Sequence, residues 1–233
     1  RMIDAQAPGL ASLIRKLSAV SFNDENGQTE FLDQLAVLYT LTEAYQRIDS
    51  LPPLLQHDVR SWIGFGQSPD ELRTREATRD LWIVLGRRTE YDENIMVLRY
   101  WLYGVNTKRF ALNMQYQAQG RTPVVSFAPG TAIDAEIVFY DSAFPFRAAV
   151  RTQHAVTPVP EIPALSGWDA VHEQETAWSA QQPFQDEKPF VVSEIRAGRS
   201  GNEWLLADST GAVVAALLPL AIGLHTFAQS LKG

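Results

Sequence analysis

The spacing of apolar residues predicts that the first third of the chain is helical. In residues 10–20, leucine and isoleucine recur every three or four positions, which places them on one side of a helix. Residues 29–48 repeat this spacing over a longer stretch, and residues 52–65 repeat it after two prolines that end the preceding helix. A short fourth helix is expected from Ser68, because SPDEL carries the capping and proline residues of a helix start.

Between about residues 80 and 151 the pattern becomes that of β-strands. Residues 81–104 are rich in β-branched and aromatic side chains, and the polar sequence EYDEN interrupts them where a hairpin turn is expected. Apolar and polar residues alternate in 109–117 and 131–141, which is the period of a half-buried strand. The residues around Pro145 are interpreted as continuing the last strand after a bend. This region predicts an antiparallel meander.

The last third begins with the proline-rich connector TPVPEIP. The pattern then predicts a helix over residues 167–181, a strand over 188–198, and a hairpin over 203–217 whose turn is Asp208 to Gly211. Residues 220–233 are expected to form a closing helix.

The predicted fold class is therefore α+β. We expect an N-terminal helical bundle of three to four helices, followed by a mostly antiparallel β-sheet or partial barrel with two further helices. The expected divisions are a helical subdomain (1–78), an antiparallel β block (79–152), and a region of connector, helix, hairpin and closing helix packed with the β block (153–233).

Composition narrows the possible functions. A content of 45% hydrophobic and 20% charged residues is that of an ordinary globular protein, which excludes a disordered or fibrous chain. The formal net charge of -7 disfavours binding to polyanions such as nucleic acids. The absence of cysteine excludes disulfides, thiolate nucleophiles and cysteine-based zinc sites. The longest apolar run, near the C-terminal end, is broken by Pro219 and Gly223 and is too short to span a membrane.

The sequence contains no complete catalytic or metal-binding motif. Asp134 and Glu136 share one face of a predicted strand and could supply the acid and base of a hydrolase, although a solvated strand face also explains them. The histidines are scattered and lack the paired spacing of a helical zinc site. They are His57, His154, His172 and His225. No catalytic residue and no metal ligand is therefore predicted.

The strongest candidate for a binding site is a group of basic residues interleaved with aromatic ones on adjacent predicted strands. Its members are Arg88, Arg99, Trp101, Tyr103, Lys108 and Arg109, with Arg87 beside them. Such a surface can stack bases and hold phosphates, and it can equally form a protein interface. In the simplest interpretation, the aromatic residues belong to the core and the cations line an exposed sheet edge.

Five stretches resemble, in the same order, the region downstream of the zinc finger in bacterial SWIM zinc finger family proteins. They are RMIDAQAPGLASLIRKL, LPPLLQHDVRSWIGF, RDLWIVLGRRTEYDENIMVLRYWLYG, FAPGTAIDAEIVFY and WLLADSTGAVVAAL. The resemblance implies an upstream zinc module, Cys-x-Cys followed by Cys-x-His, none of whose ligands is in this sequence. It also implies that Arg1 continues from a removed N-terminal part and that a C-terminal piece is missing. We therefore expect zinc only in the missing module and no cofactor in this chain.

The resemblance suggests a non-enzymatic binding or scaffolding region of a cytoplasmic bacterial protein. It implies protein partners, among them a MoxR-type ATPase and von Willebrand factor A system, and DNA or protein binding by the parent protein through its zinc module. We expect this chain alone to bind neither nucleic acid nor membrane. The alternative is a hydrolase whose site uses Asp134 or Glu136.

Overall fold

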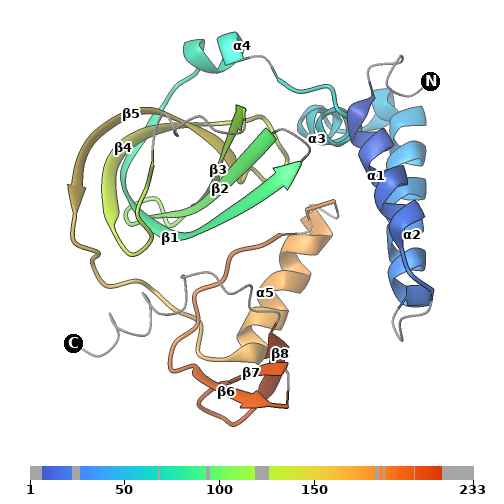
Figure 1. Ribbon diagram of the computed structural model, residues 1–233. Helices are drawn as coiled ribbons and strands as arrows, with labels where there is room; N and C mark the ends of the chain where they lie inside the picture. The colour runs from blue at the N-terminus through green and yellow to red at the C-terminus, as the bar shows by residue number, and fades with distance from the viewer. Residues whose placement is uncertain are drawn as a thin grey trace. The chain divides into compact units, whose positions relative to one another are not determined.

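The computed structural model describes residues 7–22, 27–67, 69–92, 95–118, 126–181, 184–185, 187–201 and 203–216. The chain divides into two compact units (Figure 1). The first comprises residues 1–74 and 141–144, and the second comprises residues 75–140 and 145–233. The expected three-part division of the chain stays a prediction.

The first unit contains the predicted N-terminal helices. They are α1 (Pro8–Ala19), α2 (Gly27–Gln46), the 3-10 helix η1 (Ile48–Ser50), α3 (Pro53–Ile63) and α4 (Pro69–Thr74). Pro53 occupies the first position of α3, where its missing N–H costs no hydrogen bond. Gly64 ends α3 with a φ of 121°, a conformation that a side chain would strain. α1, α2 and α3 pack pairwise, and Leu41, Val59 and Ile63 are buried among them.

Polar contacts attach residues 141–144 to this helical unit. The buried Asp58 carboxylate accepts a hydrogen bond from the Ala143 backbone N–H at 2.9 Å. The Gln67 side chain donates to the Asp141 carbonyl at 2.8 Å and accepts from the Asp141 N–H at 2.9 Å. These hydrogen bonds replace the bonds to water that the backbone groups of Asp141 and Ala143 lose when the chain folds.

The second unit is built on a closed five-stranded barrel with the order β1-β2-β3-β5-β4 (Figure 1). The strands are β1 (Thr78–Asp92), β2 (Ile95–Gly104), β3 (Phe110–Ala118), β4 (Ala132–Phe139) and β5 (Arg147–Thr157). All neighbours are antiparallel except β3 and β5, which run parallel. This five-stranded arrangement is that of the OB-fold. The predicted α+β class, with helices followed by a mostly antiparallel barrel, is confirmed.

The residues after Pro145 do not continue β4, and that expectation was wrong. They form the separate strand β5, which runs antiparallel to β4. The chain reverses direction between Tyr140 and Arg147, and the Tyr140 N–H donates to the Arg147 carbonyl across this reversal at 3.0 Å.

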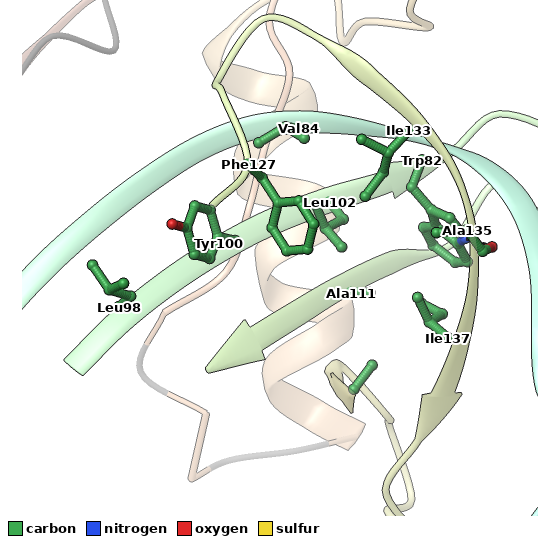
Figure 2. Packing of buried hydrophobic residues seen from close by; sticks show 11 residues of the cluster. Trp82, Val84, Leu98, Tyr100, Leu102, Ala111, Phe127, Ile133, Ala135 and Ile137 are labelled. Carbon is green, nitrogen blue, oxygen red and sulfur yellow. Dashed lines mark hydrogen bonds between the residues drawn. The ribbon is translucent and has the colours of Figure 1, made fainter. Parts of the chain in front are cut away.

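Large and small apolar side chains fill the barrel interior (Figure 2). The buried cluster comprises Trp82, Val84, Leu98, Tyr100, Leu102, Ala111, Phe127, Ile133, Ala135, Ile137 and Ala148. The Trp82 indole N–H donates to the Ala135 carbonyl at 3.1 Å, which satisfies its one polar group inside the core. The Tyr100 and Phe127 rings meet edge to face with centroids 5.0 Å apart.

Strand β3 directs its larger apolar side chains away from the barrel interior. Ala111 belongs to the interior cluster, whereas Phe110 packs with Tyr103 in a second cluster on the outside. Asn113 is buried, and its amide donates to the Ala148 carbonyl at 3.1 Å. Because the apolar face of β3 points outward, other parts of the chain must cover it.

The chain after the barrel forms α5 (Trp168–Gln181) and a three-stranded antiparallel sheet. The strands of this sheet are β6 (Arg196–Ser200), β7 (Glu203–Ala207) and β8 (Val213–Ala216). Asp208 joins the helix to the hairpin. Its carboxylate accepts bonds from the Thr210 hydroxyl at 2.6 Å and from the Trp168 backbone N–H at 3.0 Å. These bonds, the Thr210 bond first, hold the pKa of Asp208 below its usual value.

The predicted strand over residues 188–198 was mostly wrong, because regular pairing begins only at Arg196. Glu194 has a φ of 55°, which interrupts an extended backbone. Before it, Val192 forms only an isolated bridge with Leu165. The predicted closing helix over 220–233 lies outside the described residues.

A buried carboxylate fixes the turn between β2 and β3. Asp80 on β1 is 3% exposed. Its carboxylate accepts hydrogen bonds from the backbone N–H and the side chain of Asn106, and from the backbone N–H and the side chain of Thr107, at 2.7 to 3.1 Å. It also accepts a hydrogen bond from the Leu81 N–H at 2.7 Å. Burial alone would raise the pKa of Asp80, but the bonds from Thr107 and Asn106 outweigh it and lower that pKa.

We expect Asp80→Asn to lower the free energy of unfolding by about 2–4 kcal/mol, because an amide places a donor against existing donors. In the wild-type chain, the pKa of Asp80 is lower in the folded state than in the unfolded state. The ionised Asp80 carboxylate therefore stabilises the fold at pH values above the ordinary carboxyl pKa of about 4, and this stabilisation is lost as the pH falls through the folded-state pKa. Urea unfolding at several pH values measures both effects. Asp33→Asn on the exposed side of α2 is the control, and an equal loss there would contradict this role.

Candidate binding surface

The predicted binding residues of β2 lie on the outside of the barrel. Leu98, Tyr100 and Leu102 belong to the interior cluster, so the alternating Arg99 and Trp101 point outward. With Tyr103 and the outward residues of β3, they form one surface, which we call the outer β2–β3 face. The structure thus brings Arg99, Trp101 and Tyr103 onto one sheet face, and Arg88 of β1, which pairs with Arg99, projects from the same side of the sheet.

Four charged side chains at one end of this face form a neutral cluster. Arg88 on β1 lies directly opposite Arg99 on β2, a pairing of like charges that is unfavourable by itself. Glu90 lies 2.9 Å from Arg88 and 3.2 Å from Arg99. Glu187, from the segment after α5, lies 2.8 Å from Arg88 and 3.4 Å from Arg99. The two carboxylates therefore neutralise both arginines.

Aromatic rings cover the remainder of the outer β2–β3 face. Trp178 of α5 meets Phe110 and Phe146 nearly edge to face, with centroids 5.7 and 5.4 Å apart. Phe190 stacks on Trp178 with centroids 5.3 Å apart, and Trp101 contacts Phe146 at 5.6 Å. The chain thus places its own helix and the following segment over the aromatic part of the predicted surface.

Tyr103 lies near the end of β2, and the remaining predicted residues, Lys108 and Arg109, are dispersed. Tyr103 is buried, and burial followed by the nearby Asp80 charge raises its pKa. Lys108 lies in the β2–β3 turn with a φ of 56°. The Arg109 guanidinium lies 3.7 Å from the centre of the Phe139 ring, and burial lowers its pKa. Arg87 pairs with Tyr100 in the sheet register, so it projects from the opposite strand face to Arg88.

Sequence reasoning missed the residues that complete this surface. Glu187 is 99 positions from Arg88 and 88 from Arg99 in the sequence. Trp178 was placed on the predicted helix without its contacts with the barrel. No local motif marks such pairs, because they depend on how α5 and the next segment return to the sheet.

The carboxylates proposed for a hydrolase lie beside basic side chains on the barrel surface. Asp134 accepts two bonds from the Arg79 guanidinium, at 3.0 and 2.7 Å, and these bonds lower its pKa. Glu136 lies 3.3 Å from His154. A general acid at neutral pH needs a raised carboxyl pKa, so the environment of Asp134 is opposite to that requirement.

The histidines are not gathered into a metal site. His57 lies 3.9 Å from Asp141 in the helical unit, His172 is exposed on α5, and His225 lies outside the described residues. Across the part of the chain that the structure describes, no three His, Asp or Glu side chains are placed to hold a metal ion.

Comparison with known families identifies the helical region. Residues 1–63 match the SWIM-associated four-helix bundle domain. This part of the chain is thus similar to a SWIM-associated domain. The resemblance to SWIM zinc finger family proteins is therefore confirmed over residues 1–63, with α1, α2 and α3 inside the matched stretch. No curated protein and no solved structure matches the chain. Within the described residues, no helix combines the length and apolar character needed to cross a membrane.

We expect Glu187→Gln to destabilise the second unit by about 0.5–1 kcal/mol, because it leaves Arg88 and Arg99 facing each other with one carboxylate fewer. A double-mutant cycle with Arg99→Met should give a coupling of about 0.5 kcal/mol that shrinks in roughly 1 M salt. Glu203→Gln at the exposed start of β7 is the matched control. Zero coupling energy at low salt would show that the ion pairs of Glu187 do not stabilise the packing of the segment after α5 on the barrel.

Proposed function

We propose that this chain is a non-enzymatic binding and scaffolding region of a SWIM zinc finger protein, and that it holds a protein partner through α2. The observation that supports this most strongly is an apolar face of α2 that remains exposed. Leu32, Leu35 and Tyr39 are 62%, 40% and 66% exposed and follow helical spacing. On a different side of α2, Leu41 is fully buried.

A helix that is apolar on two sides usually packs against neighbours on both. In α2, one side meets α1 and α3. The matched domain is described as a four-helix bundle, while the described residues of the matched stretch contain three α-helices. An amphipathic helix of a partner, with its apolar side against Leu32, Leu35 and Tyr39, would bury this surface.

We further propose a cytoplasmic setting in which the partner is a component of a MoxR-type ATPase and von Willebrand factor A system, with zinc held by an upstream module.

The contacts of two carboxylates in the second unit also support a binding region over an enzyme. Asp134 and Glu136 both lie beside basic partners. These contacts favour a structural role for the two carboxylates over the alternative of a carboxylate hydrolase.

The test is titration calorimetry of the chain against the purified MoxR-type ATPase and von Willebrand factor A proteins of its own organism. We expect Leu32→Ser with Tyr39→Ser to weaken binding by about tenfold or more, because both side chains would be buried at the contact. Tyr91→Ser with Val213→Ser replaces exposed apolar residues of the other unit and should leave affinity unchanged. Equal weakening in both variants, with folding verified by circular dichroism, would argue against the α2 face.

We also predict that this chain alone binds neither duplex nor single-stranded DNA with useful affinity. Arg88 and Arg99 already have carboxylate partners, and the net charge of -7 repels phosphates. Titration of labelled oligonucleotides at low and moderate salt tests this. Micromolar binding that falls steeply with salt, and that is lost in Arg88→Ala with Arg99→Ala, would contradict the prediction.

A further inference from the structure

The second unit contains a pocket of about 230 Å³ beside the β2–β3 turn. It is bounded by the ends of β2 and β3, the connector before α5, α5 itself and the segment that follows it. The lining residues are Tyr103, Lys108, Phe110, Pro163, Ala164, Leu165, Gln174, Phe190 and Val191. Only Tyr103 and Lys108 belong to the predicted binding residues, so the pocket is largely distinct from the charged end of the outer β2–β3 face.

The lining combines an apolar wall with one positive charge. Phe110, Leu165 and Phe190 are apolar members of the lining, and Lys108 is its one cationic residue. Tyr103 and Gln174 add neutral hydrogen-bonding side chains, and the lining includes no acidic residue. Lys108 forms no ion pair with a carboxylate of the described residues. The pocket therefore favours an anion that is attached to an apolar group.

The backbone around Lys108 is fixed by contacts that need no ligand. The Lys108 N–H donates to the Gly104 carbonyl at 2.9 Å, which closes the β2–β3 turn. The preceding residue, Thr107, is held by the buried Asp80 carboxylate through its N–H and its hydroxyl. On the opposite wall, the Leu165 N–H donates to the Val191 carbonyl at 2.8 Å. Because both walls are anchored, binding would require little ordering of the backbone.

We propose that this pocket binds a small carboxylic acid that carries one aromatic ring or one branched apolar group. The apolar group would contact Phe110 and Phe190, and the carboxylate would pair with Lys108. An apolar cavity of about 150 Å³ is sufficient for benzene, so 230 Å³ accommodates one ring and a carboxylate. This site is independent of the protein-binding role proposed for α2.

The probe is phenylacetate, titrated into the full isotope-labelled chain and followed by NMR. We expect a Kd on the order of 1 mM or tighter, with the largest shifts at lining residues such as Leu165 and Gln174. Phenylacetamide has nearly the same shape without the charge, and we expect it to bind about tenfold more weakly. Equal affinity for the acid and the amide, or shifts centred elsewhere, would overturn the proposal.

Two variants test the site itself. Lys108→Met keeps an unbranched side chain at the same left-handed backbone position and should weaken phenylacetate binding by about tenfold, whereas Lys16→Met on α1 should not change it. Ala164→Phe adds a ring to an exposed wall position and should abolish binding without removing any buried group. Wild-type affinity in either Lys108→Met or Ala164→Phe would overturn the proposal.

Discussion

The bend in β1 is the constraint on which the architecture of the second unit depends. The first half of β1 pairs with β4, the second half pairs with β2, and the register shifts between Val84 and Gly86. A bulge of this kind increases local twist and allows a sheet to close on itself. Closure places Trp82 wholly inside the barrel, where its indole N–H meets a carbonyl of β4. An open sheet would leave this large side chain partly in water.

Closure also determines what lies outside the barrel. The interior is filled by Trp82, Tyr100 and Phe127, so the inward positions of β3 carry Ala111 and Asn113. The larger residues of β3 then face outward, and Phe110 is shielded from water only if another part of the chain packs against it. Trp178 of α5 supplies part of that cover. The position of α5 thus follows from the filled interior, and the 230 Å³ pocket lies along the same contact.

The elements that could be predicted from the sequence are those with a clear local period. Helical spacing located α1, α2 and α3, and strict alternation located β3 and β4. Alternation cannot say which face of β3 points inward, because that depends on the volume filled by Trp82 and Tyr100. The strand predicted over 188–198 failed for a different reason. Val and Phe there favour extended backbone, but Glu194 adopts a positive φ and Phe190 stacks on Trp178.

The candidate surface was only partly predictable, because some of its contacts join residues that are far apart in the sequence. The sequence pattern grouped Arg99, Trp101 and Tyr103 as one candidate site, and their alternation along β2 places all three on one face of that strand. It could not include Glu187, whose carboxylate reaches Arg88 and Arg99 from a segment 88 to 99 residues away. A basic cluster in sequence therefore became a neutral cluster in the fold.

The net charge of the chain is a poor guide to what its surfaces bind. Asp58, Asp80 and Asp208 are buried and accept backbone hydrogen bonds, so these acidic residues have structural partners. Glu90 and Glu187 are similarly engaged with Arg88 and Arg99. A bound ligand interacts mainly with the charges close to it, because exposed charges more than about 8–10 Å from the ligand are screened at physiological salt. An acidic chain can for this reason present a pocket with a positive lining.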